Sequence, residues 1–276
     1  MVFSPEGNCA DKKVSRVPEP LTSRTISIVI PCLNDAPLLR RCLDSLAAQD
    51  TLPDEIIVVD NGSTDNSAEV AREAGARVVE ESRRGITWAT HTGFDAAGGD
   101  ILARIDADIH APTDYLTRLH AAWNAADRSP GRRVVGVTGV GRFELPGWKG
   151  DVASATYLSA YRRSVGSALG HHPLFGTNYS VRRDWWEDIR GRLDSADTFS
   201  HEDMQMSFEV RPDETVWFQP DLTLDMDARP LHGAGQTARR FRRGMHTILR
   251  AWRHHPPHRR LAARGILGER AKRALA

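Results

Sequence analysis

Hydrophobic and polar positions follow two patterns along the first part of the chain, short apolar runs and stretches with helical spacing. The apolar runs are rich in β-branched residues and predict buried strands at 25–30 (stopped by Pro31), 55–60, 76–80 and 101–105. Apolar positions three or four residues apart predict helices between them, over 35–48, 66–74 and 85–97. Strands that alternate with helices on short connections indicate an α/β fold, a Rossmann-like, mainly parallel sheet with helices on both faces.

The pattern becomes less regular after residue 112. We expect four helices in this part, over 115–126, 151–169, 185–190 and 202–210. We also expect four strands, over 134–140, 179–182, 215–219 and 222–227. Residues 1–24 are polar and contain proline without periodicity, so we expect them to form a flexible leader.

Polar residues lie at the carboxyl ends of three of the predicted strands. Asn34 and Asp35 follow the first strand, Asp60 ends the second, and Asp106 and Asp108 follow the fourth. Ligands of such sheets bind beyond the carboxyl ends of the strands. The sequence therefore predicts that these side chains share one crevice.

Asp106 and Asp108 are the strongest candidates for a metal site. Where the strand pattern continues, alternation places residues i and i+2 on one side, so both carboxylates can converge on one hard cation that also holds a diphosphate. Charged groups at the end of a buried strand are costly unless something neutralises them. The alternative is that two solvated aspartates precede a helix that begins at Pro112, with Asp108 as an acidic cap.

The composition is that of one catalytic-size domain, or of one domain with appendages. The 276 residues are 40% hydrophobic, and the three cysteines show no metal-binding or disulfide-framework spacing, which favours a reducing compartment. No run has the length of a membrane-spanning helix, and the N-terminus lacks the apolar core of a signal peptide. We therefore expect a cytoplasmic protein, either soluble or attached to the inner face of a membrane.

The net charge of +1 conceals an acidic body and a basic tail. Residues 235–276 carry 12 Lys or Arg against one acid, whereas the preceding residues carry 25 basic and 35 acidic side chains. From Phe241 onward, Met245, Ile248, Leu249 and Trp252 keep a helical face with arginines elsewhere around the helix, and Pro256-Pro257 ends it. A helix packed on the body and a helix lying on an anionic membrane both fit. A nucleic-acid partner is not expected, because no nucleic-acid-binding motif accompanies the charge.

Several motifs occur together in one order. They are Ile28-Val-Ile-Pro-Cys-Leu-Asn34-Asp35, Val58-Val-Asp60-Asn-Gly-Ser-Thr-Asp65, Arg84-Gly85 and Asp106-Ala-Asp108. This order resembles the nucleotide-sugar-binding half of family 2 glycosyltransferases of the GT-A fold, over roughly residues 25 to 230. The resemblance implies a catalytic domain at 25–234, with a nucleotide-sugar-binding half at 25–110 and an acceptor half at 111–234.

The resemblance also implies roles for single residues on the donor side. Asp60 would accept from the base, typically uracil, Arg84 would lie near the diphosphate, and Asp106 with Asp108 would hold the metal and diphosphate. Pro31, Asn34, Asp35 and Asn61 would line the nucleotide sugar. Asp35 is a departure, because many members have Glu there.

Two further motifs lie in the second half. Gly176, Thr177 and Asn178 resemble the acceptor-side loop of the family, or they form an ordinary turn before a strand. Glu202 and Asp203 begin a predicted helix that Ser200 would cap, and the helix dipole alone would favour acids there. The resemblance makes Asp203 the catalytic base and Glu202 a residue that positions the acceptor or metal-bound groups. His232 is a further metal ligand or a surface residue.

The resemblance implies an inverting, metal-dependent transfer of one sugar from a nucleoside-diphosphate sugar, most often UDP-linked, to a hydroxyl of a glycan, lipid or small molecule, with Mn²⁺ or Mg²⁺. Residues 236–240 partly resemble the Gln-x-x-Arg-Trp motif of processive synthases, but Arg240 replaces the Trp. A retaining GT-A transferase and a non-catalytic sugar- or lipid-binding module are alternatives. A sugar-phosphate nucleotidyltransferase is another, but the Gly-rich phosphate loop expected after its first strand is absent at 31–34.

Overall fold

The computed structural model describes residues 24–229 and 234–266. The strands are β1 Ile26–Cys32, β2 Glu55–Asp60, β3 Arg77–Glu80, β4 Ile101–Ile105, β5 Ile109–His110, β6 Arg133–Phe143, β7 Asn178–Arg182 and β8 Glu214–Met226. The helices are α1 Ala36–Ala47, α2 Ser67–Glu73, α3 Ile86–Ala96, α4 Tyr115–Arg128, α5 Trp148–Leu169, α6 Arg183–Ile189, α7 Glu202–Glu209, α8 Ala234–His254 and α9 Pro257–Ala263, with a 3₁₀ turn at Arg190–Arg192.

The described strands form one sheet in the order β3-β2-β1-β4-β7-β6-β8-β5. Strands β1 to β4 are mutually parallel, and β7 is antiparallel to both of its neighbours. β6 and β8 are again parallel to each other. The predicted mainly parallel sheet is confirmed, and it contains strands from 25–110 and from 111–234.

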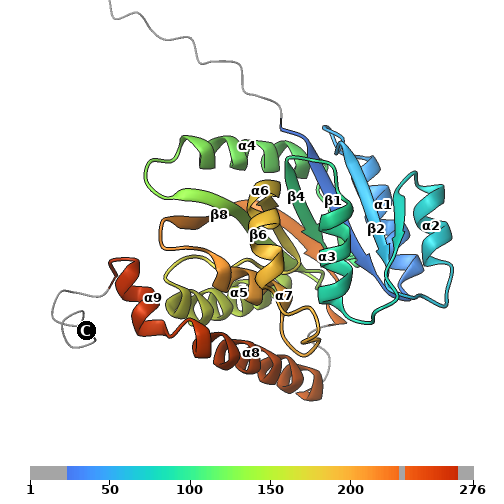
Figure 1. Cartoon of the computed structure of the whole chain (residues 1–276). Helices are drawn as coiled ribbons and strands as arrows, with labels where there is room; N and C mark the ends of the chain where they lie inside the picture. Colours follow the sequence, from blue (N-terminus) through green and yellow to red (C-terminus); the bar gives the residue numbers. More distant parts are fainter. Residues whose placement is uncertain (1–23, 230–233, 267–276) are drawn as a thin grey trace, which may run out of the picture.

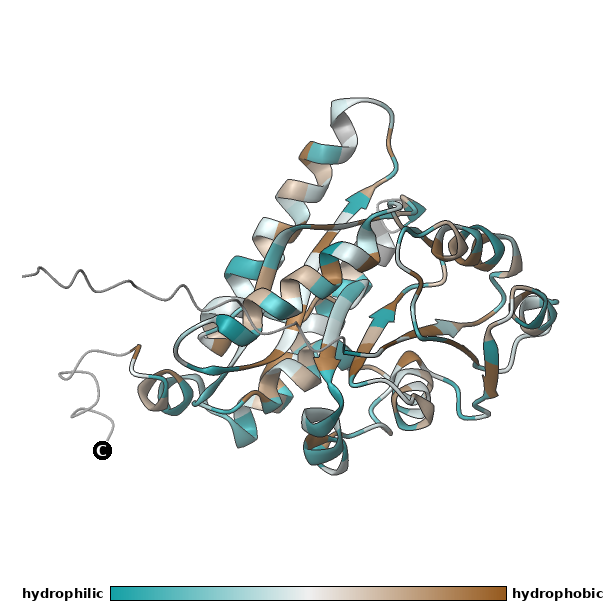
Figure 2. Ribbon diagram, turned by 90° about the horizontal axis from the view of Figure 1, so that it is seen from above, coloured by the Kyte–Doolittle hydropathy of each residue, from teal (hydrophilic) through white to brown (hydrophobic). Residues whose placement is uncertain are grey.

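Helices cover both faces of the sheet (Figure 1). On one face, Ile26, Ile28 and Ile30 of β1 pack with residues of α1, α2 and α4. On the other, Val29 of β1 packs with residues of α3, α6 and α7, including the buried Trp185. Burial of apolar side chains on both faces explains why the strands read as continuous apolar runs. Figure 2 shows these apolar strands surrounded by helices that carry both polar and apolar residues.

The boundaries differ from prediction where packing between distant segments decides them. β1 continues through Pro31, because its pairing with β4 extends only to Val29 and the missing proline N–H on that side breaks no ladder bond. Two strands were predicted over 215–227, but β8 is one strand that bulges between Phe218 and Thr223, whose partners in β6 are two residues apart. β5 and α9 were not predicted. No helix of the described residues is long and apolar enough to cross a membrane.

Candidate active site

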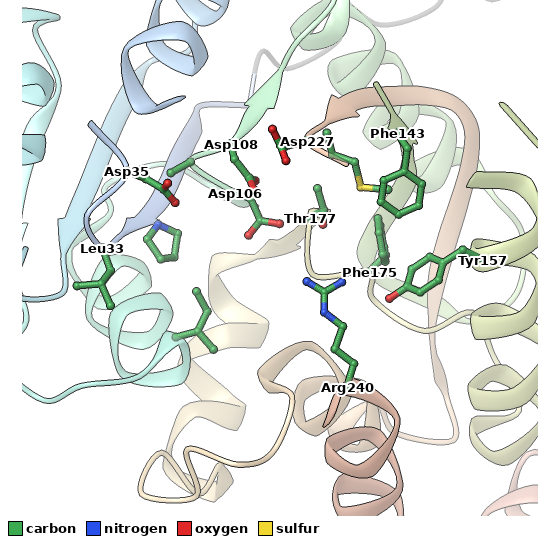
Figure 3. A pocket seen from close by; sticks show the side chains of 14 residues that line it. Leu33, Asp35, Asp106, Asp108, Phe143, Tyr157, Phe175, Thr177, Asp227 and Arg240 are labelled. Carbon is green, nitrogen blue, oxygen red and sulfur yellow. The ribbon is translucent and has the colours of Figure 1, made fainter. Parts of the chain in front are cut away.

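An open pocket of about 310 Å³ lies beyond the carboxyl ends of the N-terminal strands. Acidic side chains line one part of it (Asp35, Asp106, Asp108, Asp227). Thr177, Arg240 and aromatic side chains line another part (Phe143, Tyr157, Phe175), as Figure 3 shows. Pro31 and Leu33 complete the wall at the end of β1. The structure thus brings together Pro31, Asp35, Asp106, Asp108 and Thr177 from the predicted site.

Asp106 and Asp108 meet at this pocket through a turn and not through strand alternation. β4 ends at Ile105, and the chain turns before β5 begins at Ile109. Their convergence was predicted, but its cause is different. The alternative in which they precede a helix at Pro112 is wrong, because β5 intervenes and α4 begins only at Tyr115.

Arginine side chains neutralise this acidic part of the pocket. Arg229 contacts Asp108 at 2.8 Å and Asp35 at 3.0 Å, and its Nε lies 3.3 Å from Asp227. Burial and the neighbouring Asp106 raise the pKa of Asp108, and Arg229 works against that rise. The guanidinium group of Arg229 therefore lies next to the carboxylates that would stabilise a divalent cation, and it supplies one positive charge there.

The acidic residues fit a Mg²⁺- or Mn²⁺-type site that is completed by substrate. No group of three or more His, Cys, Asp or Glu suited to a metal occurs among the described residues. Two carboxylates, together with phosphate oxygens and water, are a common arrangement for Mg²⁺. Asp106 and Asp108 both have carboxylates at the pocket. His232, the third candidate ligand, lies outside the described residues.

The loops after β1 and β2 are held together by hydrogen bonds. The Asn34 side-chain oxygen accepts from the Thr64 N–H at 2.7 Å, and the Asn34 N–H donates to the Ser63 hydroxyl at 3.1 Å. Asp60 accepts from the Ser63 N–H at 2.9 Å. Asn34 has a positive φ of 55°, which asparagine tolerates better than most residues. Asn34 and Asp60 do not line the pocket itself, but Leu33 and Asp35, on either side of Asn34, do.

Asn61 shapes a loop and does not present its side chain to a ligand. Its amide nitrogen donates to the carbonyls of Glu81 and Arg83, and its oxygen accepts from the Gly85 N–H. The prediction that Asn61 lines the nucleotide sugar is corrected for its side chain, which is buried with these bonds made. Arg84 belongs to this loop, and its guanidinium group lies over Gly62. A Cβ added to Gly62 would be 3.7 Å from the Nε of Arg84.

Glu202 and Asp203 are buried behind the pocket wall at the start of α7. Asp203 accepts from the Gly176 N–H at 2.8 Å and from the Tyr161 hydroxyl at 3.3 Å. Burial raises the pKa of Glu202 to about 7, against the opposing effect of Arg104. Ser200 does not cap this helix, because its hydroxyl donates to Asp197.

Arg104 connects the two acidic groups, and the sequence analysis did not identify it. It lies inside β4, fully within the protein, and contacts Asp106 at 2.8 Å and Glu202 at 3.7 Å. It also donates to the carbonyl of Gly176. The available signal was an arginine in a strand otherwise made of Ile, Leu and Ala, two residues before Asp106.

The predicted acceptor-side loop divides into residues with different roles. Thr177 lines the pocket, and Gly176 uses its N–H and carbonyl to join Asp203 and Arg104. Asn178 is buried, donates to the carbonyls of Val140 and Leu222, and accepts from the Tyr115 hydroxyl. The prediction of an acceptor role for Asn178 is therefore corrected, because its amide is fully used in holding strands together.

Arg240 is a second residue that sequence reasoning did not place in the site. It projects from α8 into the pocket toward Thr177 (Figure 3). Its neighbour across the opening is Tyr157 of α5, close enough that Arg240 lowers the pKa of the tyrosine, which burial raises overall. The region predicted as a basic tail thus begins with a helix that completes the pocket.

Comparison with known proteins agrees with this geometry. The model of the family described as "Glycosyl transferase family 2" matches residues 27–189. The chain is 29% identical to glycosyltransferase AglE of Haloferax volcanii over 178 residues, 59% of this chain and 54% of that protein. It is 40% identical to the uncharacterized glycosyltransferase Rv0539 of Mycobacterium tuberculosis over 109 residues, 39% of this chain and 48% of that protein. The chain thus spans about half the length of these curated relatives.

Two solved structures show the same fold. A mannosyltransferase from Pyrobaculum calidifontis in complex with GDP-Man and Mn²⁺ has a TM-score of 0.59 and 21% identity, covering 96% of this chain and 82% of that one. Glucosyl-3-phosphoglycerate synthase from M. tuberculosis with Mn²⁺, UDP and glucosyl-3-phosphoglycerate has a TM-score of 0.51 and 23% identity, covering 90% and 82%. The predicted GT-A fold is confirmed.

Proposed function

Because the chain belongs to glycosyltransferase family 2, we propose that it transfers one sugar, with inversion, from a UDP-linked donor to an acceptor hydroxyl. The observation that carries the proposal is the shared pocket, where Asp106 and Asp108 face Thr177 and Arg240 beyond the strand ends. A donor diphosphate held at the acids places the anomeric carbon in the same pocket as an acceptor held beside Thr177.

The donor side consists of the loops after β1, β2 and β4. Asp106 and Asp108 would hold Mn²⁺ or Mg²⁺, and such a cation would supply positive charge to neutralise the leaving diphosphate. Arg229 pairs with Asp35 and Asp108, so its guanidinium would compete with that cation for the Asp108 carboxylate. Asp60, at the end of β2, accepts from the uracil base, and Arg84 lies toward the diphosphate. The neighbour structures contain UDP in one case and GDP-Man in the other, so the choice of uracil is part of the proposal.

The acceptor side uses Asp203 as general base. As the acceptor oxygen forms its bond to the anomeric carbon, the bond from that carbon to the diphosphate oxygen breaks, and the hydroxyl proton passes to Asp203. The Gly176 N–H and the Tyr161 hydroxyl fix the carboxylate of Asp203. Arg104 connects this group to Asp106, because it pairs with Asp106 and donates to the carbonyl of Gly176, whose N–H donates to Asp203. Glu202, which lies 3.7 Å from Arg104, positions the acceptor or metal-bound groups in this proposal. The acceptor is a glycan, a lipid or a small molecule. The enzyme is proposed to work in the cytoplasm, free or in peripheral contact with a membrane through residues 235–276.

Binding and turnover test the proposal separately. UDP-, GDP- and TDP-sugars are screened for protection against thermal unfolding with and without Mn²⁺, and a UDP-sugar should protect most in its presence. Asp203→Asn should keep this protection and lose about 10²- to 10⁴-fold in turnover. Asp188→Asn, which disturbs surface pairs with Arg192 and Arg211, is the matched control and should keep both. Unchanged turnover in Asp203→Asn would overturn the role of the base.

The anomeric configuration of the product separates inversion from retention. A single displacement predicts the opposite configuration from the donor, as read by proton NMR early in the reaction. The same configuration in product and donor would favour the retaining GT-A alternative.

A further inference from the structure

Helix α8 has an inner face that packs on the catalytic domain. Ile248, Ala251 and Trp252 lie against Val165 and Leu169 of α5 and against α7. Thr247 is buried and accepts from the His201 N–H at 3.0 Å. The predicted packing of this helix on the body is therefore present. The predicted single apolar face is corrected, because Ile248 and Trp252 face the body whereas Met245 and Leu249 face outward.

The outer face carries an apolar stripe. Phe241, Met245 and Leu249 are 70%, 36% and 53% exposed and follow one another at intervals of four residues. Residues at this spacing are neighbours on the surface of a helix, so they form a continuous line. Leaving such a line in water is unfavourable, which distinguishes it from scattered exposed apolar residues.

Arginines flank this stripe. Arg242 and Arg253 are exposed. Arg242, three residues before Met245, lies beside the stripe, and Arg253, four residues after Leu249, lies at its C-terminal end. Residues 234–266 contain nine arginines and no acidic residue.

Several of these nine arginines already have partners within the protein. Arg243 donates to the carbonyls of Phe199 and Ser200, and Arg250 pairs with Asp194. Arg260 and Arg264 donate to backbone carbonyls. The arginines beside the stripe are therefore a distinct, outward-facing group.

We propose that the outer face of α8, defined by Phe241, Met245 and Leu249 with Arg242 and Arg253, docks on an anionic lipid bilayer. The apolar side chains enter the boundary between head groups and acyl chains, and the guanidinium groups meet lipid phosphates. Charge complementarity selects this occupant, because a bilayer offers apolar depth and negative charge side by side. The proposal does not require the proposed glycosyl transfer.

The position of the stripe connects this surface to the pocket. Phe241 follows Arg240 directly, and Arg240 lines the pocket. When a bilayer is docked on the stripe, the pocket opening lies close to the lipid head groups. If the proposed function holds as well, an acceptor carried by a membrane lipid can be reached without leaving the bilayer.

Vesicle binding of the full chain tests the proposal. The chain is sedimented with phosphatidylcholine vesicles that do or do not contain phosphatidylglycerol, at low and at physiological salt. We expect binding to the anionic vesicles that weakens as salt rises. Phe241→Ser with Leu249→Ser, and separately Arg242→Gln with Arg253→Gln, should each lower the partition coefficient by roughly tenfold.

Matched controls come from α4 and from the loop that hydrogen-bonds to it, and α4 lies on the opposite side of the molecule from α8 (Figure 1). Leu52, 64% exposed, is in the loop before β2, next to Thr51, which hydrogen-bonds Thr117 of α4. Leu52→Ser and Arg128→Gln, an exposed arginine of α4, should bind vesicles as the unaltered chain does. Thermal unfolding checks that every variant is folded.

Three results would overturn the proposal. The first is that the folded chain does not bind anionic vesicles. The second is that Phe241→Ser with Leu249→Ser binds as strongly as the unaltered chain, and the third is that the control variants lose as much binding as the stripe variant. Light scattering adds a further one, since a dimer that dissociates only in the stripe variant would show that a second copy covers this face.

Discussion

Arg104 reaches Asp106 at 2.8 Å from inside the protein, so a carboxylate at the pocket depends on a cation buried in β4. The same guanidinium lies 3.7 Å from Glu202 and donates to the carbonyl of Gly176. Arg104 thus joins the acidic part of the pocket to the acids at the start of α7. Its pKa is raised well above its usual value by Asp106 and then Glu202, although burial opposes this, so it stays charged.

Replacing Arg104 should therefore destabilise the fold. Arg104→Met leaves Glu202 buried without its cation, and breaking a buried pair in this way costs about 3–5 kcal/mol. Arg41→Met is the control, because it breaks a surface pair with Glu144 and should cost at most about 1 kcal/mol. Urea unfolding measures both. Equal losses in the two variants would contradict a structural role for Arg104.

Glu202 should make stability depend on pH. Its folded-state pKa of about 7 lies above the ordinary value of 4.5, so the folded state binds the proton more tightly. The stabilisation from the protonated form is complete below about pH 4.5 and is lost as the pH rises to about 7. Glu202→Gln cannot titrate. The free energy of unfolding of Glu202→Gln minus that of the unaltered chain should rise between pH 5 and 7 and level off above pH 7. A difference that does not change with pH would contradict the burial of this acid.

Arg229 should compete with metal. It contacts both Asp35 and Asp108. Arg229→Gln frees these oxygens, so Mn²⁺ should bind several-fold more tightly in the absence of nucleotide, as measured by electron paramagnetic resonance of free Mn²⁺. Arg142→Gln, which breaks a pair with Asp225 outside the pocket, should leave the affinity unchanged. Weaker Mn²⁺ binding in Arg229→Gln would argue against competition.

Substitutions at Asn178 and Thr177 should have different effects, the first on stability and the second on acceptor binding. Asn178→Ala removes the partner of the buried Tyr115 hydroxyl and of the Val140 and Leu222 carbonyls, and each buried group left unpaired costs about 1–3 kcal/mol. Thr177→Ala, one residue earlier at the pocket, should be nearly neutral in stability and should raise the KM for the acceptor. Chemical unfolding and steady-state kinetics distinguish them. The reverse pattern would restore the acceptor role for Asn178.

Features that depend on consecutive residues could be predicted from the sequence, whereas features that depend on contacts between distant segments could not. The strands at 55–60 and 101–105 were predicted at their observed positions, because buried parallel strands carry their signal in consecutive residues. The pairing of β5 with the end of β8 has no local signal, and it explains how Asp106 and Asp108 reach one pocket through a turn. Arg104 looked like part of an apolar strand, because its partners Glu202 and Gly176 lie far along the chain.

Contacts between distant segments also explain why the roles of three side chains were predicted incorrectly. Asn61 and Asn178 follow family motifs, but their amides are consumed by backbone groups of other segments. Arg240 belongs to a basic tail by composition, and only the packing of α8 on α7 brings it to the pocket.

The central claim is that Asp106 and Asp108 together hold the cation that binds the donor diphosphate. Calorimetric titration of UDP with and without Mn²⁺ tests it most directly, on the unaltered chain and on Asp106→Asn with Asp108→Asn, both shown to be folded by thermal unfolding. We predict that Mn²⁺ strengthens UDP binding to the unaltered chain and has no effect on the variant. UDP binding to the variant that is as tight and as Mn²⁺-dependent as in the unaltered chain would contradict the claim.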